Sequence, residues 1–371
     1  MHPDAIAPGI PDRSPALPRQ PLGVVIAISV YYFALNLHWN ALAATIVPSQ
    51  IQGLLLLLAP RGSVGQQAAW VTAHTPFTLA IVAAPGLVVA LLANPFFGLL
   101  SDRTPGRFGR RRPYILVGTV LNVVGLVAMA FLPGALITRH SGNPLAPSIL
   151  VLMGGGMFLQ LVSNCAQAPF HALLPDLIPR EQRGQASGVM GLAQLLGSVA
   201  GFVVPALFGF NASLLLKGGQ ALGVYNAGIA RAYAVVAATI LVLALVTVVF
   251  VREVPWRPGA APTPASSAGN TSNRFALVVA GVILVAAVEV GLLNAPLGLP
   301  HSAGAVSVLQ VIALVVAAIG AAWAFELRPR RTPDFTWVIV TRMLVQLGIW
   351  IPLSFLLLIM QHYAKAPNPA A

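Results

Sequence analysis

Neutral polar side chains recur at helical spacing within two long apolar runs of the sequence. At about 100° per residue, the first set spans about 60° of one helix face and consists of Gln160, Asn164, Gln167 and His171. The second set spans about 100° of one face and consists of Tyr32, Asn36, Trp39 and Asn40. Because amides that faced lipid would leave donors and acceptors unpaired, both stripes must face protein or water.

Two interpretations of these stripes are open. Asn and Gln side chains often form hydrogen bonds between membrane helices, which would be a purely structural role. Two aligned stripes, together with Asn94 and Gln194 in other apolar runs, favour a pathway for a polar ligand. Neutral amides and aromatic rings suit a hydroxylated solute. We therefore expect a substrate site built from Tyr32, Asn36, Trp39, Asn40, Asn94, Gln160, Asn164, Gln167 and Gln194.

Three ionisable residues could add chemistry to that site. His171 could titrate near neutral pH and couple proton movement, or serve as a hydrogen-bonding group near a helix end. Glu289 is the only acid well inside an apolar run, and it is either a proton relay or a side chain that extends to the interface. Arg342, near the start of the last apolar run, could bind substrate or reach the lipid headgroups.

Enzymatic and metal chemistry are not predicted. The apolar runs hold no paired carboxylates, no histidine spacing typical of a metal site and no nucleophile elbow. Cys165 is the only cysteine, so no disulfide framework or cysteine metal site can form. We therefore expect no catalytic residue, no metal and no cofactor.

The elements that must position these residues are membrane helices. Of 371 residues, 57% are hydrophobic, and the mean hydropathy is +0.83. Since a helix needs about 20 residues to cross the hydrocarbon core, the uncharged intervals predict an all-α polytopic membrane protein with about nine helices. We place them at residues 22–50, 76–100, 114–133, 148–173, 188–210, 230–251, 275–294, 304–325 and 336–361. Residues 51–58 either prolong the first helix past a kink at Pro48 or lie at the outer interface.

The basic residues indicate the orientation of the chain. They lie in short clusters between apolar runs rather than on one continuous face, so they indicate topology and not nucleic-acid binding. Fifteen Lys and Arg residues fall in loops on the side of the N-terminus and five on the opposite side. The sequence therefore predicts a cytoplasmic N-terminus and a C-terminus on the outer side.

The densest basic cluster holds five of the 21 Lys and Arg residues between Arg103 and Arg112. It follows the second predicted helix, whose negative dipole end disfavours Asp102. Asp102 therefore needs a partner, either a loop arginine or the N-terminus of a neighbouring helix. The alternative is that the cluster only fixes topology, which would require neither Asp102 nor the glycines of the motif.

This cluster also carries a family resemblance. The pattern Gly98-x3-Asp102-Arg103 followed by Gly109-Arg110-Arg111 resembles the loop between helices 2 and 3 of the major facilitator superfamily. Its longer form resembles the sugar-cation symporter branch, which includes sucrose and melibiose carriers. The stretch from Asn164 to Arg183 is similar to helix 4 and the 4/5 loop of that branch, and residues 334–346 are similar to the start of its second half.

The resemblance implies a carrier that works by alternating access in the cytoplasmic membrane, with a small polar solute, such as a sugar, as substrate and H⁺ as a coupling ion. It also implies a gating motif formed by Gly98, Asp102, Arg103, Arg107, Gly109, Arg110, Arg111, Asp176 and Arg183. Two departures are notable. Ala90 and Asn94 stand where melibiose-type carriers place cation-binding aspartates, which argues against a sodium site, and His171 replaces an arginine of the sucrose carriers.

The domain division follows from the resemblance. We expect a cytoplasmic tail (1–21), a six-helix N-terminal half (22–251), a cytoplasmic linker (252–274), an inserted two-helix hairpin (275–326), the first helix of a second half (327–361) and a tail (362–371). A complete carrier of this kind has two six-helix halves. We therefore expect either a truncated, non-transporting carrier half or a pathway that a second chain or second copy completes.

Overall fold

The computed structural model describes residues 18–57, 59–104, 108–139, 145–210 and 221–253, and the single residues 337, 341 and 344. The described residues are almost entirely helical and contain no β-strand. Within these described ranges, six segments are long and apolar enough to cross a membrane. The prediction of an all-α polytopic membrane protein is confirmed. Helices 7 to 9 of the predicted set lie outside the described residues, apart from three isolated positions.

The helices run as follows: α1 (Leu22–Ala41), a π-helical segment (Leu42–Ile46), α2 (Val47–Leu56), α3 (Val64–Arg103), α4 (Arg112–Arg139), α5 (Leu145–Leu177), a 3-10 turn (Arg180–Gln182), α6 (Arg183–Leu207) and α8 (Leu222–Phe250). The first three segments form one continuous span from Leu22 to Leu56. Of the two alternatives for residues 51–58, the structure therefore shows a prolonged first helix up to Leu56. The irregular segment that interrupts it is the π-helix, which lies just before Pro48.

Helix α3 corresponds to the second predicted helix, residues 76–100, but begins twelve residues earlier, at Val64. A capping motif explains this early start. Ser63 and Gln66 form a capping box: Ser63 Oγ accepts from the Gln66 backbone N–H, and Gln66 Oε1 accepts from the Ser63 backbone N–H at 3.0 Å. Three prolines inside α3 do not end it. Its 40 residues make a helix about 60 Å long, well beyond the roughly 30 Å of a hydrocarbon core.

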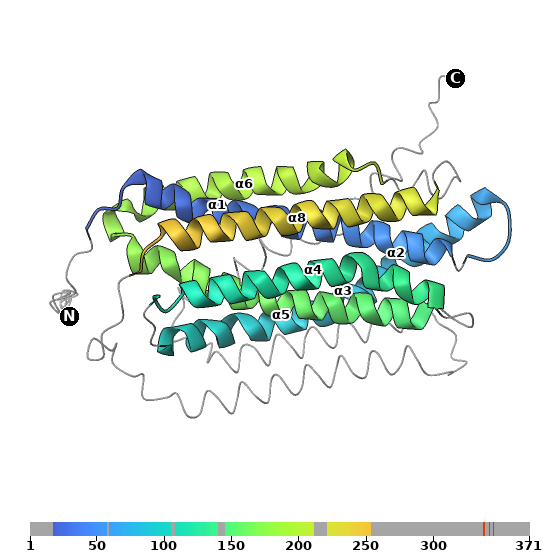
Figure 1. Ribbon diagram of the computed structural model, residues 1–371, viewed down its shortest axis with the longest axis horizontal. Coiled ribbons are helices and arrows are strands. Elements are labelled where there is room, and N and C mark those ends of the chain that lie inside the picture. The colour runs from blue at the N-terminus through green and yellow to red at the C-terminus, as the bar shows by residue number, and fades with distance from the viewer. Residues whose placement is uncertain are drawn as a thin grey trace, which may run out of the picture.

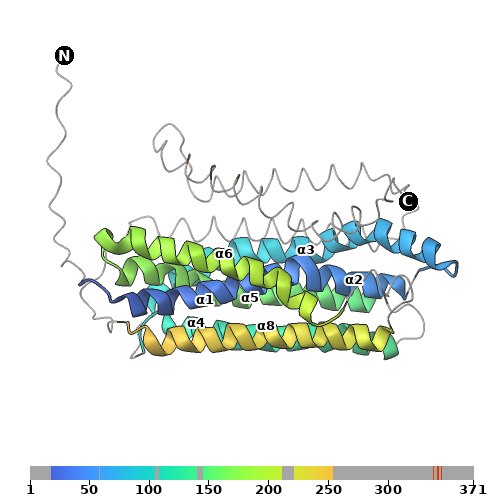
Figure 2. The same ribbon diagram turned by 90° about the horizontal axis from the view of Figure 1, so that it is seen from above.

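The six spans form two columns of three helices. In one column, the upper one in Figure 1, α1 lies between α6 and α8, and in the other, the lower one, α5 lies between α3 and α4. Contacts between α4 and α8 join the columns. Figure 2 shows the result as layers, with α4 and α8 in one layer, α1 and α5 in the middle, and α3 and α6 on the opposite side.

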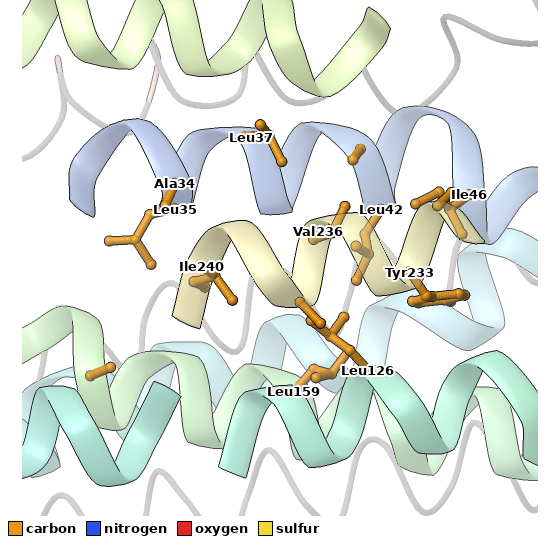
Figure 3. Packing of buried hydrophobic residues seen from close by; sticks show 14 of the residues in the cluster. Ala34, Leu35, Leu37, Leu42, Ile46, Leu126, Leu159, Tyr233, Val236 and Ile240 are labelled. Carbon is orange, nitrogen blue, oxygen red and sulfur yellow. The ribbon is translucent and has the colours of Figure 1, made fainter. Parts of the chain in front are cut away.

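Apolar packing fills the space between α1, α8, α4 and α5. Figure 3 shows Tyr233, Val236 and Ile240 of α8 beneath Leu35 of α1 and Leu42 and Ile46 of the π-helical segment, with Leu126 of α4 and Leu159 of α5 below them. The buried tyrosines also satisfy their hydroxyl groups, because Tyr31 pairs with Thr119 at 2.8 Å and Tyr233 donates to Gln50 Oε1 at 3.0 Å. Buried polar atoms in a membrane bundle need such partners.

Helices α6 and α1 approach each other closely at two glycines. A Cβ atom at Gly201 would lie 2.7 Å from the carbonyl oxygen of Leu37, and one at Gly197 would overlap the carbonyl of Phe33. Gly197 and Gly201 are four residues apart and so lie on one helix face. Small residues of this kind let membrane helices pack backbone to backbone.

Candidate functional site

The loop between α3 and α4 folds into a network of ion pairs, which we call the loop-end network: Ser101, Asp102, Arg110, Arg111, Asp176 and Glu253. It lies at the end of the bundle where α3, α5 and α8 finish and α4 begins, which we call the loop end. The network therefore joins four of the six spans.

Arg111 is the centre of this network. Its side chain is only 5% exposed, and its guanidinium contacts Asp102 Oδ1 at 2.5 Å, Asp176 Oδ2 at 3.1 Å and Ser101 Oγ at 2.6 Å. Arg110 donates to the same oxygen of Asp176 at 2.8 Å. Asp102 thus has a loop arginine as its partner, which is the first of the two alternatives that the sequence left open. A buried guanidinium needs paired carboxylates to offset its lost hydration.

Glu253, which the sequence analysis did not select, contributes the backbone contacts. Its carboxylate accepts from three consecutive backbone N–H groups, those of Arg110 at 2.8 Å, Arg111 at 3.0 Å and Arg112 at 2.7 Å. These N–H groups lie at the start of α4, where the helix dipole favours an anion. The available signal was an acid directly after a predicted helix, but its partner lies more than 140 positions away.

The other predicted gating residues have different surroundings. Arg183 donates to the carbonyl oxygens of Ile178 at 3.2 Å and Pro175 at 3.1 Å, and so caps the end of α5. Arg103 is exposed, and a Cβ atom at Gly98 would meet nothing within 4 Å. Arg107 lies outside the described residues. The structure therefore brings Asp102, Arg110, Arg111 and Asp176 together, and it joins Gly98 to them through its carbonyl oxygen, which accepts from Ser101 Oγ at 2.9 Å. Arg103 forms none of these contacts.

The α1 stripe faces α6. Tyr32 Oη donates to Gln194 Oε1 at 3.3 Å, and Asn40 Nδ2 lies 3.2 Å from Ser198 Oγ. Asn36 and Asn40 also donate to carbonyl oxygens one turn earlier, each at 2.8 Å. Trp39 is half-buried, with its ring 4.7 Å from that of His38.

The α5 stripe faces α3 and α1. Asn94 Nδ2 donates to Asn164 Oδ1 at 3.1 Å, and Asn164 Nδ2 donates to the carbonyl oxygen of Gln160 at 2.8 Å. Gln167 Nε2 lies 3.3 Å from His171 Nε2, and the His171 ring meets the Tyr32 ring edge-on at 5.5 Å. The Gln160 side chain packs beside Gly86 of α3.

We call the residues of both stripes, with Asn94, Gln194 and Ser198, the polar face. It draws on α1, α3, α5 and α6, and Tyr32 connects its two parts through His171 and Gln194. These contacts show that several amides form hydrogen bonds between helices, as the structural interpretation expects. They also show that the nine predicted substrate residues with described positions lie on neighbouring helices. The face offers N–H donors, carbonyl acceptors, hydroxyls and aromatic rings, which can bind the hydroxyl groups of a neutral solute.

Two more predicted residues cannot be placed. Glu289 and Arg342 both lie outside the described residues. Within the described ranges, no group of three or more His, Cys, Asp or Glu side chains is arranged to hold a metal ion.

Comparison with known proteins identifies relatives of this chain. A family model described as MFS/sugar transport protein matches residues 67–299. The sucrose transport protein SUC3 of Arabidopsis thaliana is 27% identical over 180 residues, which cover 46% of this chain and 30% of that protein. The sucrose transport protein SUT1 of Oryza sativa subsp. japonica is 26% identical over 226 residues, which cover 58% of this chain and 40% of that protein. The chain therefore spans well under half the length of these curated relatives.

Proposed function

Because this chain belongs to the MFS/sugar transport protein family, we propose that it is a membrane carrier that moves sugars or related polar solutes by alternating access. The polar face is the observation that carries this proposal. Its pairs Tyr32–Gln194 and Asn94–Asn164 join amides and a phenol from four apolar helices. Polar residues at such positions are costly in a membrane, which supports a functional role.

The proposed substrate is a neutral, hydroxylated solute. The described part of the polar face holds amide, hydroxyl, aromatic and imidazole groups, but no Asp, Glu, Lys or Arg side chain. Hydrogen bonds from such groups match the alternating donors and acceptors of a sugar. The printed names of the two relatives describe sucrose transport, which makes sucrose the first substrate to test.

His171 is the proposed site of proton coupling. It is the only titratable side chain of the described polar face apart from the Tyr32 phenol, with which its ring is in contact. Histidine changes charge near neutral pH. Protonation there would alter the contacts with Gln167 and Tyr32 that join α5 to α1.

We place the carrier in the cytoplasmic membrane with the loop end towards the cytoplasm. The excess of Lys and Arg in the loops on that side supports this orientation. It makes the N-terminus cytoplasmic and the C-terminus external.

A carrier half completed by a second chain or a second copy is the second candidate. Gln194 is exposed within the described residues although it belongs to the polar face. A partner that covered this face would complete a pathway between two halves. In that case the protein would be active only as an assembly.

Transport by the purified full-length chain in proteoliposomes tests both candidates. We expect saturable uptake of radiolabelled sucrose that an inwardly directed proton gradient stimulates, with protein-free liposomes as the control. Cross-linking in the same vesicles would show whether the active unit is one chain or an assembly. If correctly inserted protein in either state takes up no sugar or polyol, the proposed function is wrong.

A further inference from the structure

The Glu253 carboxylate lies at the loop end, three residues after α8, and reaches the start of a different helix. It accepts the backbone N–H groups of Arg110, Arg111 and Arg112 at 2.7 to 3.0 Å. A helix start leaves such donors without intrahelical partners, and a residue just before the helix usually supplies the cap. Here the cap comes from another span, so the first turn of α4 depends on the position of the end of α8.

Gly109 gives an independent indication of the same contact. Its φ of +93° lies in the left-handed region, which glycine adopts without strain. A Cβ atom at this position would also lie 2.7 Å from Glu253 Cδ and 2.8 Å from Glu253 Cβ. The glycine therefore both turns the loop and leaves the space that the glutamate occupies.

The side chains of the same two arginines carry the ion pairs of the network. Arg110 bonds Asp176 of α5, and Arg111 bonds both Asp176 and Asp102 of α3. Glu253, which follows α8, accepts hydrogen bonds from the backbone N–H groups of both arginines. It thereby orients the backbone from which the two side chains extend. Arg112 adds a further link, because its guanidinium donates to the carbonyl oxygen of Val248 in α8.

We propose that Glu253 is the positioning residue of the loop-end network: it holds the backbone of Arg110 to Arg112 so that Asp102, Arg111 and Asp176 pair, and it thereby couples the end of α8 to α3 and α5. The coupling is a property of the described bundle and does not depend on the transported solute. A displacement of the chain after α8 would loosen the arginine backbone and with it the ion pairs between α3 and α5.

The native thiol of Cys165 is a built-in reporter for this coupling. Cys165 is the only cysteine of the chain and is 8% exposed, and its Sγ lies 4.0 Å from the carbonyl oxygen of Tyr114 in the first turn of α4. Loss of the cap would loosen that turn and admit a reagent. We expect Glu253→Ala to raise the rate of alkylation by N-ethylmaleimide about tenfold, as an opening of this local unit would.

Two matched variants make the result specific. Glu253→Gln keeps a carbonyl acceptor but loses the charge, so its alkylation rate should lie between those of the wild type and Glu253→Ala. Glu181→Gln removes an exposed acid in the nearby 3-10 turn and should leave the rate unchanged. A Glu253→Ala rate equal to that of the wild type would overturn the proposal.

A second reporter separates positioning from a general loss of stability. Thr75 is fully buried towards the opposite end of α3, and Thr75→Cys in a Cys165→Ser background reports on that end. Glu253→Ala should leave its alkylation rate unchanged. Equal acceleration at both reporters would mean that the whole bundle loosens, and the proposal would be rejected even if the protein transported sugar normally.

Gly109→Ala provides a double-mutant cycle with Glu253→Ala. In the native background the added methyl group meets Cδ, Oε2 and Cβ of Glu253, whereas in Glu253→Ala only the contact with Cβ and the backbone strain remain. We therefore expect Gly109→Ala to raise the alkylation of Cys165 at least about threefold more in the native background than in Glu253→Ala. Additive effects of the two substitutions would contradict a direct contact between Gly109 and Glu253.

Discussion

At the scale of single residues, the amides of the polar face form hydrogen bonds between helices and also carry further donor and acceptor sites. Asn164 accepts from Asn94 and donates to the carbonyl oxygen of Gln160. An amide has two N–H donors and an oxygen with two lone pairs. The bonds described for Asn164 use one donor and one lone pair, and the other two sites can bind a solute hydroxyl.

Asn164→Leu should therefore weaken substrate binding. Loss of one or two hydrogen bonds predicts a rise in the KM for sugar uptake of about tenfold. Asn122→Leu is the matched control, because Asn122 is also a buried amide that bonds across helices, to Ser163, but it lies outside the polar face. This control should lower thermal stability and leave KM unchanged; a similar KM shift in both variants would argue against a role for Asn164 in binding.

His171→Ala should remove the proton dependence of uptake while downhill exchange of sugar continues. The reason is the position of the ring between Gln167 and Tyr32, where a change of charge alters both contacts. His74→Ala is the control, since that exposed ring is stacked on Trp70, away from the polar face. Uptake is measured against external pH, and an unchanged pH profile in His171→Ala would exclude His171 from coupling.

At the scale of elements, the π-helical segment determines which neighbouring helices the residues after it in the first span face. Tyr32 and Gln50 are eighteen residues apart, about five turns of a regular α-helix, so a regular helix would align them on the polar face. The π segment adds a residue to one turn. Gln50 instead lies on the side of Tyr31 and bonds Tyr233 of α8 and the carbonyl oxygen of Met129 in α4.

The packing of α6 on α1 also belongs to this scale. Gly197→Ala should destabilise the protein by about 1–3 kcal/mol, because the added methyl group overlaps the backbone of α1 at Phe33. Gly188→Ala on the same helix is the control, since a Cβ atom there meets nothing within 4 Å. Thermal unfolding in detergent measures both. Equal melting temperatures would show that α6 and α1 do not pack this closely.

At the scale of the whole molecule, the two columns pack in the same way. The pair α1–α6 corresponds to α5–α3, and α1–α8 corresponds to α5–α4. This arrangement is the one expected of two related three-helix units. It places α1 and α5, which carry the two polar stripes, at the centre of the columns.

The orientation of the molecule can be tested without a transport assay. We expect the N-terminus and the loop between α3 and α4 to be cytoplasmic because of their basic residues. In a Cys165→Ser background, Phe108→Cys should react with an impermeant maleimide only after the membrane is permeabilised, because Phe108 is 76% exposed at the loop end. Val64→Cys, at the opposite end of α3, should react in intact cells. The reverse pattern would invert the topology.

The sequence by itself determined the class of the protein, the first six spans and the two polar stripes. These follow from local rules: uncharged length sets a span, and the 3.6-residue period sets a face. The loop motif likewise indicated that Asp102 needs a partner. It could not choose among the arginines, because that choice depends on where α5 places Asp176.

Only the tertiary structure decided the pairs Tyr32–Gln194 and Asn94–Asn164, the register of α2 and the role of Glu253. The first two are contacts between helices far apart in the chain, and helical periodicity gives the face of a residue but not its neighbour. The register of α2 depends on one inserted residue that no local pattern marks. Glu253 reaches α4 only because α8 packs beside it, which is a property of the assembled bundle.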